Sequence, residues 1–564
     1  MIYGARMMRY KSKNYKVLEN LLSKSRRFNL PPEIDYIIIY TFLYKYCSDS
    51  LKDHFSMVLQ DKELTLDEAY EDSLYSEILK EDAMNLFGYH IRKSDAFIDE
   101  VINNSYSDRF FLSKFFSIFP QNIIFRNDSK DKQYFDSLFQ VIKEEISVRD
   151  YEYDNEMNLA IKEIIYSISQ LDVFDAEFEF TKVFDIIASS RLMHVYSNPE
   201  YISQILSTLI SCEKTSVKSV YDPFMKDGSS LIHLSDLTEM GVTYYGKEED
   251  KVTYYYTLAR FFINIFYLNN VVFKNEDATE SIDIEGASFD AILSEIPISI
   301  KNYQSSNKKQ SFEIAKRSKR NELEDVLFKN FGVSSDSFSQ DMELNSALEN
   351  LLEKIDVDNG SAEDFTGEYE SLKENEFLFL INLIDSLKDD GIMAISISQN
   401  FLYKNSLETL RKYLTYEKNY IDAIISIPEE LGRRRPEVVI VFRKDRNSDS
   451  ILFIDMSKDF KTQKSKNIFP GLFRRNLILA NETINKMKDV FTNRLTIDKF
   501  SNVVRLDEIK QNNFNLAVSR YVDTFEGEFI KLDDLTSEKI EIEDNIKKLN
   551  LKIEEMMDEL NIRF

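Results

Sequence analysis

The sequence predicts an α/β protein in three parts: an N-terminal helical domain, an α/β domain built around a parallel sheet, and a C-terminal helical tail. Glycine is almost absent from the first 185 residues, which is typical of long helices with few tight turns. From about residue 186, short apolar runs alternate with helical patterns, as in a parallel sheet with covering helices. Near the C-terminus, apolar residues recur at heptad spacing.

The N-terminal helical domain is expected to span residues 1–185. Its only glycines are Gly4 and Gly88. Segments 34–46 and 159–171 alternate apolar clusters with charges at helical spacing. Both segments are therefore predicted to be helices that bury one face.

The α/β domain is expected over residues 186–500. Its strand candidates are short apolar runs at residues 217–221, 243–246, 270–273, 289–293, 391–396, 421–426 and 437–442. A charged insertion at residues 299–370 follows the fourth of these runs. A long charged loop of this kind is most often solvated, and the sequence gives it no further role.

The C-terminal segment, residues 501–564, ends in a predicted helix with an apolar stripe. The stripe alternates spacings of four and three residues and is flanked by Glu and Lys. It consists of Ile542, Ile546, Leu549, Ile553, Met556 and Leu560. Fewer than three full heptads are short for an independent coiled coil, so the helix either packs on its own domain or docks on a partner.

The composition narrows the class of protein. The 564 residues, 43% of them hydrophobic and 30% charged, are too many for one hydrophobic core. No run of about 18 apolar residues occurs and the basic start leads into no apolar signal core, so we expect a cytoplasmic protein without a membrane contact. Cys47 and Cys212 lie far apart and form no ligand-spaced cluster with the four histidines, so neither a disulfide nor a metal site is predicted.

The formal net charge of −26 argues against a chain that grips DNA unaided, because neutralising phosphates requires clustered Lys and Arg. We expect the acidic residues to be spread over solvated faces. Basic islands remain candidates for contact with backbone phosphates, at residues 308–309, 316–320, 433–435 and 474–475.

Two short segments of the α/β domain carry most of the functional information. Residues 221–232 read YDPFMKDGSSLI, and residues 289–299 read FDAILSEIPIS. They resemble the DPACGSGGFL and FDVVLANPPFG signatures of the modification (M) subunit of type I restriction-modification systems, an adenine-specific DNA methyltransferase family, with most of the chemical groups replaced. The resemblance implies that residues 186–500 form a Rossmann-like S-adenosylmethionine-dependent methyltransferase domain.

The resemblance extends over most of the chain. Residues 195–206 resemble the family segment that precedes the first signature, and residues 377–411 resemble its helix, strand and return helix. Residues 500–509 and 515–523 resemble the family's C-terminal signature. A generic Rossmann-like nucleotide-binding protein has no use for that last signature, so an M-subunit architecture explains the order best.

The resemblance implies a cofactor site at Asp222, Gly228, Glu248 and Asp277. Glu248 matches the family acid that hydrogen-bonds the ribose hydroxyls of S-adenosylmethionine, at the end of the second strand. Asp277 matches the acid that receives the adenine amine. The adenosyl half of the site is thus expected to retain its acids.

Three substitutions in the cofactor loop predict weak binding of S-adenosylmethionine, or none. Lys226, Asp227 and Ser229 stand where the family has Gly, Ser and Gly. Added side chains restrict positive φ and fill space that the ligand needs. We also expect the Asp227 carboxylate to repel the cofactor's own carboxylate.

The catalytic segment departs further from the family pattern. In the family an Asn side chain and the next Pro carbonyl accept hydrogen bonds from the target amine, while an aromatic ring stacks on the flipped base. Glu295, Ile296, Pro297 and Ile298 stand at these positions. Glu295 carries a charge that is costly to bury unpaired, and Ile298 lacks the ring whose stacking is worth about 1–3 kcal/mol.

Two functions follow from these departures. The favoured one is a catalytically degenerate M-subunit-like pseudoenzyme, a structural or regulatory component of a DNA restriction or phage-defence complex. The alternative is an active, site-specific adenine DNA methyltransferase in which Glu295 replaces the usual Asn or Asp and an aromatic residue such as Tyr303 stacks on the base. Changes in both the cofactor loop and the catalytic loop favour the pseudoenzyme, because an enzyme of altered specificity would keep the cofactor loop.

The resemblance also implies partners. The C-terminal helix is expected to dock on a specificity (S) subunit-like protein. A second M subunit, a nuclease subunit and double-stranded DNA are further expected members of the complex.

Overall fold

The computed structural model describes residues 12–297, 379–457, 479–523 and 539–549, with short gaps inside these ranges, among them 428–436. The insertion 299–370, the four basic islands, Ile298 and Tyr303 lie outside the described residues. The second half of the C-terminal stripe, from Ile553 to Leu560, lies outside them as well.

The N-terminal part is helical, as predicted. Its central helix is α3 (Ile34–Leu59), which is buried along most of its length because apolar side chains surround it. The other helices are α2 (Lys13–Ser25), α4 (Leu66–Glu71), α5 (Ser73–Leu86), α6 (Ile98–Ser105), α7 (Phe111–Asn122), α8 (Lys130–Ser147), α9 (Glu156–Ser169) and α10 (Phe180–Ala188). An antiparallel pair, β1 (Tyr89–Ile91) and β2 (Ile123–Phe125), is a departure from the all-helical prediction.

A nine-stranded sheet forms the second part, in the order β11-β10-β8-β9-β7-β6-β3-β4-β5. The strands are β3 (Ser219–Asp222), β4 (Thr243–Lys247), β5 (Val271–Lys274), β6 (Phe289–Glu295), β7 (Leu387–Ser398), β8 (Ile421–Ser426), β9 (Glu437–Arg443), β10 (Ser450–Asp455) and β11 (Ser501–Arg505). All seven predicted strands are confirmed. The sequence prediction missed β10 and β11, and β11 extends the sheet past residue 500.

The sheet is mixed rather than wholly parallel. β9 runs antiparallel to both β7 and β8, and β11 runs antiparallel to β10. The other neighbouring pairs are parallel. Residues 427–436, which join β8 to β9, are too few for a crossover helix, so these two strands pair as antiparallel neighbours.

Helices cover both faces of the sheet. On β6, Ala291 and Leu293 face one hydrophobic core while Ile292 between them faces the other, because successive strand residues point to opposite sides. Phe289 joins the second core because the strand register shifts between Phe289 and Ala291. The first core includes side chains of α11 (Glu200–Ser211), α12 (Ser229–Ser235), α13 (Lys251–Ile265) and α20 (Asn481–Asn493). The second includes α18 (Asn400–Tyr403), the π-helix at Tyr413–Glu417 and α21 (Leu506–Gln511), and α19 (Glu408–Lys412) leads into that π-helix.

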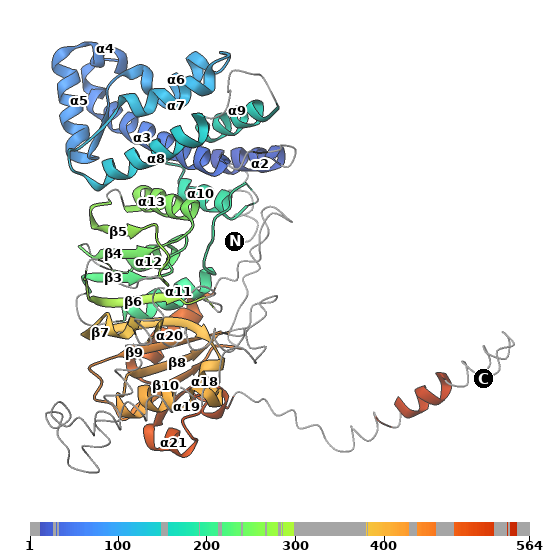
Figure 1. Cartoon of the computed structure of the whole chain (residues 1–564). Coiled ribbons are helices and arrows are strands. Elements are labelled where there is room, and N and C mark those ends of the chain that lie inside the picture. The colour runs from blue at the N-terminus through green and yellow to red at the C-terminus, as the bar shows by residue number, and fades with distance from the viewer. Residues whose placement is uncertain are drawn as a thin grey trace, which may run out of the picture.

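The helical part packs on the β5 end of the sheet, where Figure 1 shows α8 and α13 side by side. Lys130 on α8 donates to the carbonyl of Val271 on β5 at 2.7 Å. The neighbouring Asp131 accepts from the Leu268 backbone N–H at 2.9 Å. One hydrophobic core continues from the N-terminal helices to this face of the sheet, so the two parts are not independent. Among the described residues no helix is long and apolar enough to cross a membrane.

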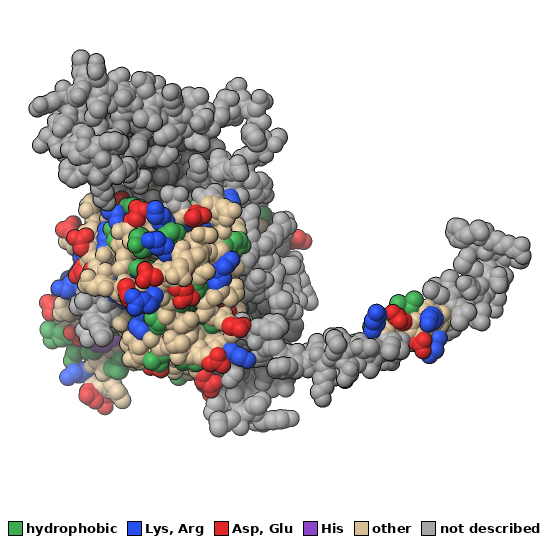
Figure 2. Space-filling view, turned by 90° about the horizontal axis from the view of Figure 1, so that it is seen from below, with side chains coloured by type: hydrophobic (Ala, Val, Ile, Leu, Met, Phe, Trp, Pro, Cys, Tyr) green, Lys and Arg blue, Asp and Glu red, His purple; other side chains and the backbone are tan. Residues whose placement is uncertain are grey.

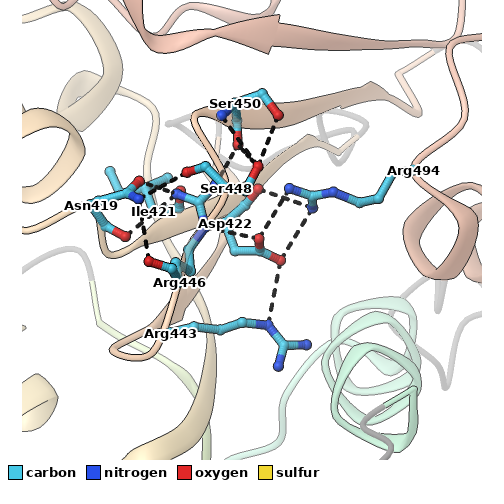
Figure 3. Close-up of polar contacts among 8 residues, drawn as sticks. All are labelled: Asn419, Ile421, Asp422, Arg443, Arg446, Ser448, Ser450 and Arg494. Carbon is cyan, nitrogen blue, oxygen red and sulfur yellow. Dashed lines mark hydrogen bonds and ion pairs between the residues drawn. The ribbon is translucent and has the colours of Figure 1, made fainter.

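An arginine cluster ties together three strands at the edge of the sheet opposite the carboxyl end of β8 (Figure 3). Asp422 lies 3.1 Å from Arg446 Nε, 3.1 Å from Arg494 Nη2 and 3.5 Å from Arg443 Nε. Arg446 is almost fully buried and also donates to carbonyl oxygens of Ile421 and Ser450. The cluster therefore holds β8 to the end of β9 and the start of β10.

Candidate functional site

The residues that the sequence predicted as a site lie at the carboxyl edge of the sheet. β3 is flanked by β4 on one side and β6 on the other, both parallel to it. The chain thus proceeds from β3 through β4 to β5 and then returns to the far side of β3, which makes a topological switch point. Ligands of open α/β sheets bind in the crevice at such a point. Asp222 ends β3, Glu295 ends β6, and Glu248 and Asp277 follow β4 and β5.

Asp222 is fully buried at this switch point. Its Oδ1 accepts from Ser294 Oγ at 2.7 Å and from the Phe224 N–H at 3.0 Å. Its Oδ2 is buried and accepts no hydrogen bond from the described residues. Burial raises the pKa of Asp222 to about 7, and the nearby Glu295 charge acts in the same direction. The carboxyl group is therefore poised to hold a proton near neutral pH.

The loop after β3 is a tight turn over the end of β4. The Met225 N–H donates to the Lys247 carbonyl at 3.1 Å, and the Gly228 N–H donates to the Met225 carbonyl at 2.8 Å. Gly228 has φ of 71°, and a Cβ atom there would lie 2.8 Å from Thr257 Cγ2 on α13. This glycine is thus required for packing against α13, whatever ligand the loop binds.

Asp227 does not present an uncompensated charge. Its Oδ2 accepts from Ser229 Oγ at 2.8 Å and lies 3.7 Å from Arg260 Nη1. Arg260 also donates to the Asp227 carbonyl at 3.0 Å, and its guanidinium is anchored by Asp185 at 2.9 Å. Burial raises the pKa of Asp227, although Arg260 opposes that shift. The Asp227 carboxylate therefore has a cationic partner inside the protein, which weakens the charge repulsion expected from the sequence.

Lys226 and Glu295 form an ion pair across the two signature segments. Lys226 Nζ lies 3.3 Å from Glu295 Oε2, and the Glu295 side chain is only 8% exposed. The next residue, Ile296, is buried and donates its N–H to the Ser396 carbonyl at 3.0 Å. Pro297 is partly buried. The two positions where the sequence departs most from the family thus contact each other.

The two acids of the predicted adenosyl half differ in environment. Glu248 is buried and accepts from the Asp250 N–H at 2.9 Å. Burial raises the pKa of Glu248 to about 7, and the charges of Asp250 and Glu249 also raise it, whereas Lys226 lowers it. Asp277 is only partly buried and accepts two hydrogen bonds of 2.7 Å from Thr279.

The structure therefore pairs Glu295 with the Lys226 ammonium, and Asp222, Glu248 and Asp277 lie at or just after the ends of the neighbouring strands β3, β4 and β5. Arg260 and Ser294 were not predicted as site residues: Arg260 lies outside both signatures, and Ser294 lies in the second signature but at a position to which the sequence assigned no role. Among the described residues no group of three or more His, Cys, Asp or Glu side chains is arranged to hold a metal ion.

S-adenosylmethionine, which the resemblance implies, fits one half of this site better than the other. Carboxylates after β4 and β5 are suited to accept hydrogen bonds from ribose hydroxyls and an adenine amine. At the methionine half, a lysine side chain stands where the family has glycine, and its ammonium is already paired with Glu295. The two carboxylates that the resemblance implies for the nucleoside are thus present after β4 and β5, whereas the residues beside the end of β3 are altered.

A Rossmann-like sheet with acids at its switch point defines a class, and comparison with known proteins defines the family. A model of the N-6 DNA methylase family matches residues 188–331 and 352–528, more than half of the chain. The chain belongs to the N-6 DNA methylase family.

Known relatives agree with the M-subunit resemblance. The methylase subunit of the type I restriction enzyme MpnII of Mycoplasma pneumoniae is 23% identical over 568 residues, which cover 94% of this chain and 92% of that protein. The MjaVII methylase subunit of Methanocaldococcus jannaschii is 32% identical over 173 residues, 30% of this chain and 28% of that protein. The crystal structure of a type I methyltransferase subunit from Streptococcus thermophilus has the same fold, with a TM-score of 0.63 and 20% identity over 92% of this chain and 100% of that one. The resemblance to type I M subunits is confirmed.

Proposed function

We propose that this chain is a catalytically degenerate methylase subunit that serves as a structural or regulatory component of a DNA restriction or phage-defence complex in the cytoplasm. The observation that carries the proposal is the ion pair between Lys226 and Glu295. It joins the cofactor loop to the catalytic segment, and both partners replace residues that the family uses for chemistry. Such a contact favours a closed site over one that admits cofactor and base.

Glu295 is also poorly suited to receive a target amine. Its carboxylate is nearly buried and lies beside a cation, so a neutral amine would have to displace an ion pair. A buried charge that loses its partner is costly. The pseudoenzyme therefore accounts for Glu295 more simply than turnover does.

An active adenine methyltransferase is the second candidate, and a specific observation favours it. Glu248 and Asp277 keep the positions of the family's cofactor acids at the ends of β4 and β5. Asp222 retains a buried carboxylate at the switch point. A protein that never binds S-adenosylmethionine has no need of all three.

The proposed partners are an S-subunit-like protein on the C-terminal helix, a second M subunit, a nuclease subunit and double-stranded DNA held by the whole complex. Ile542, Ile546 and Leu549 are each more than half exposed, which suits a helix that awaits a partner. On the face seen from below, Figure 2 shows Lys and Arg interspersed with Asp and Glu. A face on which positive and negative side chains alternate binds phosphates weakly, so we assign DNA binding to the assembled complex.

Two measurements test the proposal. Isothermal titration of the purified chain with S-adenosylmethionine is expected to give weak binding or none. Methylation-sensitive sequencing of host DNA, with and without the gene, is expected to find no adenine mark that depends on it. Micromolar binding that is lost on Glu248→Ala, together with gene-dependent marks, would replace the proposal with the active enzyme.

A further inference from the structure

Lys226 places an ammonium group against the carboxylate of Glu295 at the carboxyl edge of the sheet. Its Nζ lies 3.3 Å from Glu295 Oε2. Burial raises the pKa values of Asp222 and Glu248, and the Lys226 charge opposes both shifts, so the ammonium is close enough to act on each of them. The side chain thus serves as the counter-ion of Glu295 at the end of β6.

The backbone of Lys226 adopts a left-handed conformation in the turn after β3. Its φ of 49° lies in the left-handed region, which is costly for a residue that has a Cβ atom. The turn requires that conformation, because the Lys226 carbonyl accepts from Thr257 Oγ1 at 2.6 Å while Met225 and Gly228 hold the flanking hydrogen bonds. Glycine would adopt it without strain. Backbone strain of this kind concentrates at functional positions.

S-adenosylmethionine carries a net positive charge, because its amino group and carboxylate offset each other and its sulfonium adds a further positive charge. A buried cluster of carboxylates attracts such a cation, because charges interact strongly where water is excluded. Lys226 already satisfies that attraction from within the chain. A second cation brought beside it would meet a like charge.

We propose that Lys226 is an internal counter-ion that closes the methionine end of the site, supplying the positive charge that Glu295, at the end of β6, would otherwise take from a cationic ligand. This inference rests on the proposed function, since it assigns the loss of cofactor binding to one side chain. Lys226 acts by excluding S-adenosylmethionine from this end of the site.

Two substitutions separate charge from bulk. Lys226→Met removes the ammonium and keeps a long side chain, whereas Lys226→Gly removes both and relieves the strained φ. Lys388→Met is the matched control. Lys388 on β7 pairs at 2.7 Å with Asp290, which lies at the opposite end of β6 from Glu295. The titrants are S-adenosylmethionine and its uncharged-sulfur product, S-adenosylhomocysteine.

Isothermal titration at pH 8 is expected to show at least about tenfold tighter binding of S-adenosylmethionine to both Lys226 variants than to the parent chain. The gain is expected to be smaller for S-adenosylhomocysteine, which lacks the sulfonium charge. S-adenosylmethionine is also expected to raise the Tm of Lys226→Gly but not of Lys388→Met. Equal affinities for the Lys226 variants and the control would overturn the inference.

The outcomes for Lys226 and for the proposed function are separable. The ratio of variant to parent affinity tests the role of Lys226, whereas the affinity of the parent chain tests the proposed function. If both Lys226 variants fail to fold, Glu295→Gln breaks the ion pair from the strand side. That variant is expected to show no gain in affinity for S-adenosylmethionine, because Lys226 keeps its charge while one carboxylate is lost, and a folded Glu295→Gln chain that binds more tightly than the parent would contradict the inference.

Discussion

Single side chains at the carboxyl edge of the sheet carry most of the functional argument. Lys226 has a left-handed backbone conformation, which costs an L residue about 1–2 kcal/mol. Its ammonium group forms an ion pair with Glu295. Asp227, which the sequence made a candidate for repelling the cofactor, is instead neutralised by Arg260. The departures from the family are thus compensated within the protein.

At Glu295 we expect substitution by alanine to leave the protective activity of the assembled complex unchanged and to remove no adenine mark. No chemistry depends on this carboxylate if the site does not turn over, whereas a group acting in the transition state affects turnover directly. Phage plating and methylation-sensitive sequencing provide the readouts, with deletion of the gene as the reference. Adenine marks that vanish in Glu295→Ala would mean that the chain is an active enzyme.

Asp222 predicts a dependence of stability on pH. Its pKa is about 7 in the folded chain, against 3.8 for an ordinary Asp, because it is buried. The folded state therefore binds the proton more tightly than the unfolded state, so this contribution favours folding at low pH and is lost as pH rises from about 4 to 7. The free energy of unfolding of Asp222→Asn, relative to that of the parent, is therefore expected to rise by up to about 4 kcal/mol as the pH increases from about 4 to 7, at about 1.4 kcal/mol per pKa unit.

Urea unfolding at pH 5 and pH 8 measures that difference. Asp290→Asn is the control of opposite sign: burial raises the pKa of Asp290, but hydrogen bonds from Lys388 and Ser219 outweigh it and lower the pKa. The free energy of unfolding of Asp290→Asn, relative to the parent, is therefore expected to be no higher at pH 8 than at pH 5. A stability difference between Asp222→Asn and the parent that is the same at both pH values contradicts the prediction.

At the scale of elements, charge pairing fixes how strands meet. Asp422 on β8 contacts three arginines that come from β9, the turn before β10 and the end of α20 (Figure 3). Burial lowers the pKa of Arg446, yet its hydrogen bonds to backbone carbonyls keep the guanidinium in place. The cluster explains how the short antiparallel insertion of β9 is held within an otherwise parallel run.

We expect Asp422→Asn to lower the free energy of unfolding by about 3 kcal/mol, because removing the carboxylate leaves three clustered guanidinium groups without their counter-charge. Asp449→Asn is the matched control, since its ion pair with Arg505 is largely exposed and such pairs contribute little. Urea unfolding measures both variants. Equal losses in the two would show that the Asp422 cluster adds no more than a surface pair.

At the scale of the whole molecule, the helical part and the sheet share one core, and the C-terminal helix offers an exposed stripe. A chain that ends at Asp533 is therefore expected to fold with an unchanged Tm but to lose co-purification with the S-subunit-like protein. In the full chain, Ile546→Asp is expected to have the same effect, because a charge on the stripe is costly to bury at an interface.

Lys547→Ala is the control for Ile546→Asp, since Lys547 is an exposed neighbour outside the stripe. It is expected to preserve the complex. Undiminished assembly of the chain truncated at Asp533 would instead favour a terminal helix with no role in partner binding.

The sequence by itself determined the family, the order of the parts and the seven strands around the signatures, because strand, turn and helix signals are local and the two signatures are contiguous. It also placed Asp222, Glu248, Glu295 and Asp277 at strand ends, from which a common edge follows. Only the tertiary structure decided that Lys226 pairs with Glu295, that Asp227 lies beside Arg260, and that β9 is antiparallel to its neighbours in the sheet. These contacts join residues far apart in the chain, and they depend on strand register and side-chain packing, which no local pattern encodes.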